Sequence, residues 1–177
     1  MTNLVFKEHA PGYRNAGFEP RPVEPGKKAC KEKGWNKSDT ELPEGAFEKW
    51  MENRGHYGIG LRLGAEFSDG TRLAALDIDD DRFVRVAKYL LGNPPCGRIG
   101  SKGVAYFVRL RGSTRFGRKV FDITPADGAK VHVGELLGVG GFLVIPPTIH
   151  PSTKKPYRWV DKPLPDTPYA ELPIIEV

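Results

Sequence analysis

The chain has few of the residues that build metal clusters or disulfide frameworks. Its 177 residues include only two cysteines, Cys30 and Cys96, and four histidines. No group of these residues has the Cys/His spacing that is typical of zinc sites. With so few cysteines a disulfide framework is not expected, which fits a protein of the reducing cytoplasm. The chain is long enough for one domain with a hydrophobic core of its own.

Long apolar runs are missing as well. The longest run, residues 136–145, contains three glycines and is far too short to span a bilayer. The N-terminus carries Lys7, Glu8 and His9 and does not resemble a signal peptide. We therefore expect no membrane partner and a cytoplasmic location.

What the chain does have is glycine, proline and positive charge. Its 21 glycines and 16 prolines favour a loop-rich α+β or β-rich domain over a helix bundle. The net charge is +5 and the isoelectric point is near 9.2. This charge favours an anionic partner, with nucleic acid or nucleotide first.

The residues that organise the chain are two aspartates at the end of an apolar run, residues 73–79. Asp77 and Asp79 are two positions apart, so on a strand they project from the same face, while Leu76 and Ile78 point into a core. Two neighbouring carboxylates repel each other and resist burial, and a divalent cation is the usual remedy. The competing interpretation, that the aspartates only cap the next helix, suits Asp80 or Asp81 but leaves Asp77 unexplained, since aspartate is disfavoured within strands.

The remaining pattern predicts a series of short elements. Residues 1–40 indicate an ordered, extended N-terminal segment, and a helix is expected from about residue 42 to residue 54. Strands are expected at residues 57–64 and 73–79, joined as an antiparallel hairpin by the turn at residues 68–71. A helix at about residues 82–91 follows, with strands at 104–110, 130–137, 142–145 and 157–160. The helix at about residues 82–91 is expected to bury one face, formed by Phe83, Val86, Ala87 and Leu90.

Basic residues dominate the stretch from residue 98 to residue 119, and no acidic residue interrupts them. A solvated basic hairpin would explain this stretch. However, a cationic strand beside a carboxylate site suits a substrate that carries phosphates and metal together. The basic residues are Arg98, Lys102, Arg109, Arg111, Arg115, Arg118 and Lys119.

The order of several short motifs resembles the primase-polymerase (prim-pol) branch of the archaeo-eukaryotic primase superfamily, which is typical of plasmids, phages and integrated elements. Each motif alone is weak, but together they cover about residues 17–160. They are Pro25-Gly26-Lys27-Lys28-Ala29 with Gly34-Trp35, Gly58-Ile59-Gly60, Leu76-Asp77-Ile78-Asp79, Ser101-Lys102-Gly103 with Tyr106-Phe107, Glu135-Leu136-Leu137-Gly138, and Pro146-Pro147-Thr148-Ile149-His150-Pro151 with Tyr157-Arg158-Trp159.

This resemblance implies an α+β archaeo-eukaryotic primase catalytic fold, in which helices flank an RRM-like mixed or antiparallel sheet. It implies one catalytic domain over residues 1–177, with an N-terminal segment (1–40), a core (about 41–160) and a Pro-rich exit (161–177), expected to be a monomer. It also implies transfer of nucleotides from (d)NTP to a 3′-hydroxyl on a primed single-stranded DNA template. Mg²⁺ or Mn²⁺ would be held by Asp77, Asp79 and Glu135.

One departure concerns the nucleotide-binding residue. The family usually has a histidine where the alignment places Ala105. Arg98, Ser101 and Lys102, in a turn whose glycines allow close backbone approach, would bind the triphosphate instead. His150 and Lys28 are further candidates for nucleotide binding. The alternative for His150 is a structural role at the corner, and the alternative for Lys28 is a solvated surface lysine. His132 is interpreted as a packing residue.

The other basic residues would contact template or primer phosphates: Arg109, Arg111, Arg115, Arg118 and Lys119.

Three functions remain open at this point. A DNA polymerase and primase module comes first; a non-catalytic nucleic-acid-binding module with the same fold comes second, and a metal-dependent nuclease third. The chain has no P-loop, so a helicase domain or protein is a candidate partner in place of an internal helicase. We expect residues 1–177 to extend primers but to start new chains poorly, because initiation must position two free nucleotides without a duplex.

Overall fold

The structure is a computed structural model, and it describes residues 4–112, 115–126 and 128–177. The α+β class expected from the sequence is confirmed. The helices are α1 (Val5–Asn15), α2 (Ala46–Asn53) and α3 (Asp81–Leu90), with short 3₁₀ turns η1 (Asp39–Glu41), η2 (Leu164–Asp166) and η3 (Tyr169–Glu171). The strands are β1 (Glu19–Val23), β2 (Gly58–Arg62), β3 (Arg72–Ile78), β4 (Cys96–Ile99), β5 (Val104–Arg111), β6 (Arg118–Ile123), β7 (Val131–Leu137), β8 (Phe142–Val144), β9 (Arg158–Asp161) and β10 (Ile174–Glu176).

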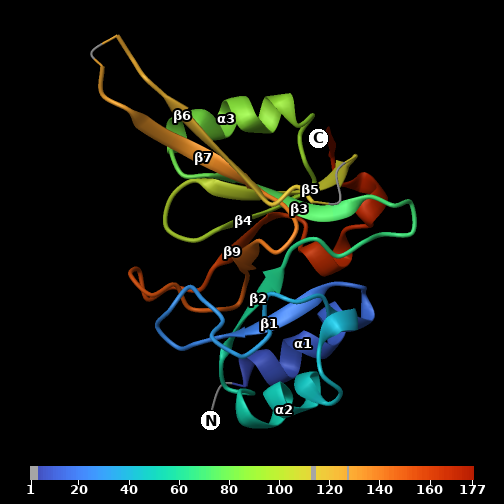
Figure 1. Ribbon diagram of the computed structural model, residues 1–177. Coiled ribbons are helices and arrows are strands. Elements are labelled where there is room, and N and C mark those ends of the chain that lie inside the picture. Colours follow the sequence, from blue (N-terminus) through green and yellow to red (C-terminus); the bar gives the residue numbers. More distant parts are fainter. Residues whose placement is uncertain (1–3, 113–114, 127) are drawn as a thin grey trace.

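The strands form two sheets. The smaller sheet is antiparallel, in the order β1-β2-β8, and the larger follows the order β6-β7-β3-β5-β4-β9. β10 pairs with the C-terminal part of β5 in the parallel direction, so the larger sheet is mixed. Figure 1 shows β3 and β5 in the middle of the larger sheet, with the β6–β7 hairpin projecting beyond it.

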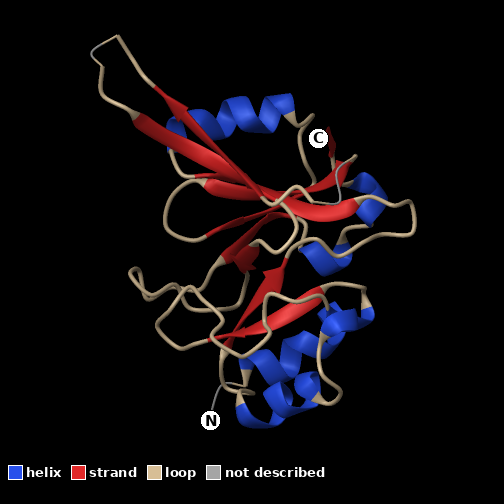
Figure 2. Ribbon diagram, viewed as in Figure 1, coloured by secondary structure: helices blue, strands red, loops and turns tan. Residues whose placement is uncertain are grey.

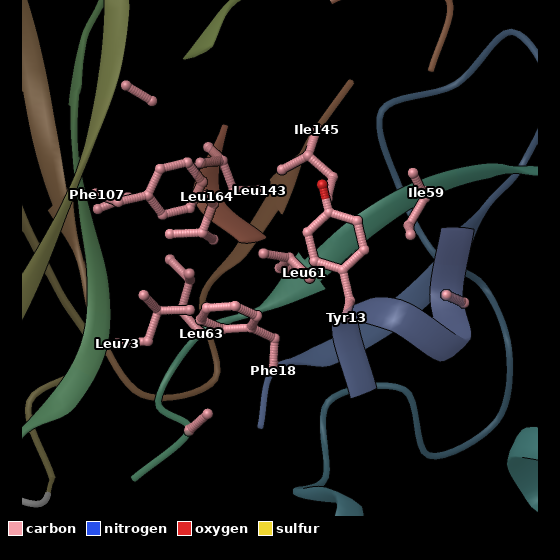
Figure 3. Packing of buried hydrophobic residues seen from close by; sticks show 14 of the residues in the cluster. Tyr13, Phe18, Ile59, Leu61, Leu63, Leu73, Phe107, Leu143, Ile145 and Leu164 are labelled. Carbon is pink, nitrogen blue, oxygen red and sulfur yellow. The ribbon is translucent and has the colours of Figure 1, made fainter. Parts of the chain in front are cut away.

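The main hydrophobic core lies between the two sheets and is closed at one end by α1 and α2 (Figure 2). Leu61 of β2 and Leu143 of β8 meet Leu73 of β3 and Phe107 of β5 there (Figure 3). The opposite face of the larger sheet packs against α3 through a separate cluster around Ile78. Because β3 has apolar neighbours on both faces, its C-terminal end is held rigidly, and that end carries the two aspartates.

The expected hairpin of two paired strands is wrong. The turn is present, because Thr71 donates backbone and hydroxyl hydrogen bonds to Asp69 Oδ1 (3.0 and 2.6 Å). Next to the turn, an isolated bridge between Glu66 and Arg72 and the backbone hydrogen bonds of Leu73 with Gly64 and Ala65 join the two arms. Beyond these contacts β2 enters the smaller sheet and β3 the larger one. Both strands are apolar enough to be buried on two sides, and each finds its partners elsewhere.

The chain termini differ from the extended segments expected from the sequence. α1 lies within residues 1–40; Pro11 and Gly12 inside it obscured the helical pattern. At the other end, residues 161–177 do not leave the domain, because Leu164 and Leu172 are fully buried and β10 extends the larger sheet.

The predicted stripe of α3 is also partly wrong. Ala87 is buried and Phe83 half-buried, but Val86 and Leu90 are 53% and 76% exposed. The helix contacts the sheet through Phe83, Val84, Ala87 and the following Leu91. Among the described residues the longest helix, α1, has 11 residues, and none of the helices there could span a bilayer.

Candidate active site

The two aspartates lie where β3 ends. Asp77 is within β3, and Asp79 follows directly, with its backbone N–H donating to the carbonyl of Val133 on β7 (2.9 Å). Asp80 is the N-cap of α3 and accepts a hydrogen bond from the backbone N–H of Arg82 (3.0 Å). The capping role therefore belongs to Asp80, and the side chains of Asp77 and Asp79 remain available on the face toward the smaller sheet.

The third carboxylate comes from the neighbouring strand. Asp77 pairs with Glu135 of β7 on one side and with Ala105 of β5 on the other. Ala105 in turn pairs with Arg98 of β4. Because paired residues of antiparallel strands share a face, Arg98, Ala105, Asp77 and Glu135 form one row across the sheet. We call Asp77, Asp79 and Glu135 the acidic trio.

Two glycines allow neighbouring backbone to approach this end of β3. A Cβ atom on Gly103 would lie 1.8 Å from the carbonyl oxygen of Ile78, and one on Gly134 would lie 2.1 Å from that of Asp77. Gly103 also has φ +61° and donates its N–H to Asp81 Oδ1 (2.7 Å). Any side chain at either position would push the strands apart, so both glycines are needed to place the acidic trio.

Each member of the acidic trio contacts a cationic side chain. Arg98 Nη2 lies 3.4 Å from Asp77 Oδ2, and His132 Nε2 lies 3.1 Å from Asp79 Oδ2. Glu135 accepts a hydrogen bond from Arg118 Nε. Burial raises the pKa of Asp77; Arg98 counteracts this, whereas the charges of Asp79 and Glu135 raise the pKa further. The cationic neighbours therefore compensate the carboxylates only in part.

The acidic trio lines one side of a pocket of about 230 Å³, which we call the carboxylate pocket. Phe142 and Val144 of the smaller sheet and Tyr157 form much of the other walls. The pocket also collects all five residues that the sequence suggested for nucleotide binding: Lys28, Arg98, Ser101, Lys102 and His150. They come from three separate parts of the chain, at residues 28, 98–102 and 150, which the fold brings together. Their roles remain predictions.

Arg98 brings a buried, unused hydrogen-bond donor to this pocket. Its Nε atom is buried and has no hydrogen-bond partner among the residues that the structure describes. The central carbon of its guanidinium group lies 5.1 Å from the centre of the Tyr157 ring, which is within the range of a cation–π contact. The small side chain of Ala105 leaves room for Arg98 to reach across to Asp77. Arg98 thus lies next to the position where the family usually has a histidine.

His150 is buried and is partly committed to the local backbone. Its Nδ1 atom accepts N–H groups from Ser152 (3.2 Å) and Thr153 (3.3 Å). Burial, and then Lys28 and Arg98, lower the pKa of His150. The ring is therefore neutral at pH 7 with its proton on Nε2, and it both holds the corner at residues 150–153 and lines the pocket.

A divalent cation fits the chemistry of the acidic trio. Carboxylate oxygens are the ligands that Mg²⁺ and Mn²⁺ prefer, and the raised pKa of Asp77 indicates that its negative charge is under-compensated. The trio is not arranged as a finished metal site: the described residues contain no group of three or more His, Cys, Asp or Glu side chains that could hold a metal ion. Metal binding therefore requires the carboxylates to turn away from their cationic neighbours.

His132 was interpreted from the sequence as a packing residue, and this is wrong. Its ring is exposed and lies between Asp79 and Asp122, with Nδ1 3.0 Å from Asp122 Oδ1. Hydrogen bonding to Asp122, and then to Asp79, raises its pKa. A register shift between Phe121 and Asp122 places His132 on the face of Glu135. Strict alternation along a strand could not have shown this.

Most of the basic stretch lies away from the carboxylate pocket. Arg111 is six residues along β5 from Ala105, about 20 Å at the usual rise of a strand, and it pairs with Glu176 (3.1 Å). Lys119 is on the face of β6 opposite to Glu135, and Arg115 is exposed in the turn before β6. Arg118 contacts the pocket residue Glu135, so its charge is paired with a carboxylate there.

Arg109 contradicts its expected contact with DNA. Only 6% of the residue is exposed. Its guanidinium group donates to Asp69 Oδ2 (2.7 Å) and to the carbonyls of Leu172 (3.1 Å) and Ala170 (3.0 Å). Arg109 therefore holds the β2–β3 turn and the C-terminal segment to β5, and its basic charge is used inside the fold.

Comparison with known protein families identifies the family of this chain. The family model for the N-terminal domain of bifunctional DNA primase/polymerases (Prim-Pol) matches residues 10–174. The chain belongs to the Prim-Pol family. This confirms the resemblance read from the motifs. The match begins inside α1 and ends at the first residue of β10. No curated protein matches the chain.

The Prim-Pol family fixes the general kind of function, which is that of a DNA primase/polymerase with DNA and nucleotides as substrates. Such activity is nucleotidyl transfer in the service of DNA replication, and the family is generally metal-dependent. The position of the acidic trio beside cationic pocket residues suits these substrates.

Proposed function

We propose that this Prim-Pol domain is a template-directed nucleotidyltransferase that transfers nucleotides from (d)NTP to a primer 3′-hydroxyl, with two divalent cations, Mg²⁺ or Mn²⁺, held by the acidic trio. The observation that supports this most strongly is the composition of the carboxylate pocket. One side carries three carboxylates, and the other carries cationic groups, of which Arg98 has an unused buried donor. A substrate that combines metal and phosphates satisfies both sides.

In the proposed reaction each group of the pocket has a separate task. Asp77, Asp79 and Glu135 supply oxygen ligands from two adjacent strands, which fixes their spacing. The bound cations supply a lower pKa for the attacking hydroxyl and neutralise the triphosphate. Arg98, oriented by Tyr157, donates hydrogen bonds from one plane to phosphate oxygens. The walls formed by Phe142 and Val144 limit the access of water.

Arg98 takes over the role of the histidine that the family usually has. Its row neighbour Ala105 lies between it and Asp77, and burial leaves Arg98 Nε without another partner in the described residues. If Asp77 held a cation, the guanidinium group of Arg98 would be released from Asp77 and could donate to phosphate. Lys102, in the turn that Gly103 closes, approaches from the solvent side.

Lys102→Ala tests the nucleotide side of the pocket. We expect a rise of about tenfold in the apparent Km for dNTP with little change in kcat, because an exposed lysine that holds phosphate as a point charge contributes about 1.4 kcal/mol. The measurement is steady-state primer extension at saturating template. An unchanged Km together with weaker DNA binding would assign Lys102 to the template.

Primer extension with labelled dNTP in Mg²⁺ or Mn²⁺ tests the proposed function itself. Lengthening of the primer, with bases that match the template, is the expected result. A shortened primer would indicate a nuclease. Binding of template without any change in primer length would indicate a module that keeps the fold and has lost turnover.

A further inference from the structure

Because Arg109 is buried and bonded inside the fold, another basic segment is needed to bind nucleic acid. The relevant segment is the loop between β1 and η1, residues 24–38, which we call the lysine loop. It carries five exposed lysines: Lys27, Lys28, Lys31, Lys33 and Lys37.

The two acidic residues of the lysine loop are already paired. Glu24 contacts Lys31 (2.9 Å), and Glu32 contacts Arg54 of α2 (2.6 Å). The other four lysines have no carboxylate within salt-bridge distance in the described parts of the chain. The loop therefore presents a row of uncompensated positive charges.

Buried arginines fix the backbone of the lysine loop. Arg21 is fully buried and donates to the carbonyls of Trp35 (2.8 Å) and Lys37 (2.8 Å). Arg62 donates to the carbonyl of Asn36 (2.7 Å). Arg21 also pairs with Asp39 (2.6 Å) at the start of η1. A loop held at three successive carbonyls presents its lysines in a fixed arrangement, which lowers the entropic cost of binding.

The two ends of the lysine loop reach two different cavities. Lys28 lines the carboxylate pocket, whereas Lys33 and Lys37 line a groove of about 800 Å³. On its other side this groove is lined by α2, including Lys49 and Trp50. We call it the α2 groove.

The carboxylate pocket and the α2 groove are connected by a series of contacts through Trp35 of the lysine loop, one of them to its backbone carbonyl. Phe142, a wall of the carboxylate pocket, contacts Trp35 of the lysine loop with 5.3 Å between ring centres. Arg21, which binds the Trp35 carbonyl, lies 5.3 Å above the ring of Trp50 in the α2 groove. The lysine loop thus forms a basic path from one cavity to the other.

We propose that the lysine loop and the α2 groove bind the phosphates of single-stranded DNA and lead the strand to the carboxylate pocket. This inference rests on the proposed function for the identity of the strand as template. The lining of the groove is basic on balance: Lys33, Lys37 and Lys49 make no salt bridge with any residue that the structure describes, Arg54 is paired with Glu32, and Glu44 is the other acidic residue. The lining contains no counterpart of the acidic trio, so it suits a phosphate backbone without metal.

The test removes the three unpaired lysines of the α2 groove, as Lys33→Gln, Lys37→Gln and Lys49→Gln in one protein. A matched control removes three lysines elsewhere, as Lys7→Gln, Lys88→Gln and Lys162→Gln, and so has the same net charge; Lys7 and Lys162 are exposed and Lys88 is half-buried. Binding of fluorescent oligo(dT) is measured by anisotropy over a range of salt concentrations, without metal and without dNTP. Thermal unfolding midpoints establish that all proteins are folded.

For the groove variant we expect the slope of log affinity against log salt to fall by about 2, since each phosphate contact to a single strand contributes about 0.7. At 0.1 M salt this corresponds to an affinity loss of about 100-fold. The control is expected to keep nearly the full slope and affinity. Equal losses in both variants, or no loss in the groove variant, would overturn the proposal.

Failure of this proposal is distinguishable from failure of the proposed function. Asp77→Asn is expected to lose nucleotide incorporation while it binds oligo(dT) as the unmodified protein does. The groove variant is expected to keep its apparent Km for dNTP and, at saturating template, its kcat. A groove variant that loses dNTP binding instead of DNA binding would contradict the proposed binding of single-stranded DNA by the lysine loop and the α2 groove.

Discussion

Asp77→Asn is expected to reduce primer extension about 10³-fold or more. Asn keeps the size of the side chain but removes the negative charge that the cations need in the middle of the acidic trio. Charge stabilisation by a bound metal is worth several kcal/mol, and about 4 kcal/mol corresponds to a factor of 10³ in rate. Single-turnover incorporation of labelled dNTP on a primed template is the measurement.

Two further readouts separate a metal role from a structural one. Without metal, Asp77→Asn is expected to be at least as stable as the unmodified protein at pH 7. Burial, and then the charges of Asp79 and Glu135, raise the pKa of Asp77 despite Arg98, so that ionising Asp77 costs folding free energy. Mn²⁺ is expected to raise the unfolding midpoint of the unmodified protein but much less that of the variant. Asp166→Asn, at an exposed carboxylate in η2, is the control that should behave normally. Extension by Asp77→Asn at the normal rate would remove Asp77 from the site.

The centre of the site could be predicted because its signal is local. Alternation alone put Asp77 and Asp79 on one face of a strand, and the motif order added Glu135. Their convergence with Lys28 and His150 depends on how the smaller sheet and the corner after β8 pack on the larger sheet. That packing is set by contacts between residues far apart in the chain, which the pattern of a single segment does not contain.

The errors have equally physical causes. Pro11 and Gly12 hid α1 because both residues are poor helix formers, yet tertiary packing of Phe6 and Ala10 keeps the helix. His132 was misassigned because a register shift changed the face on which it lies. The prediction for Arg109 is wrong because a sequence shows which residues are charged but not which of them are paired inside the fold.

Arg109→Ala is expected to lower the free energy of unfolding by about 3 kcal/mol, because removal of a buried arginine leaves its partners unpaired. Those partners are Asp69 and the carbonyls of Ala170 and Leu172. For a chain of 177 residues this corresponds to a decrease of about 10 °C in the unfolding midpoint. Calorimetry or thermal denaturation followed by circular dichroism measures it.

Arg111→Ala is the matched control for this change, since it removes the same side chain two residues further along β5. The side chain of Arg111 is 54% exposed and makes an ion pair with Glu176, so its loss is expected to cost at most about 1 kcal/mol. Measured well below the unfolding midpoint, Arg109→Ala should bind oligo(dT) with unchanged affinity and an unchanged salt slope, because its guanidinium group is not on the surface. A variant of normal stability that binds single-stranded DNA more weakly would return Arg109 to the nucleic-acid interface and place the strand along β5 instead of the lysine loop.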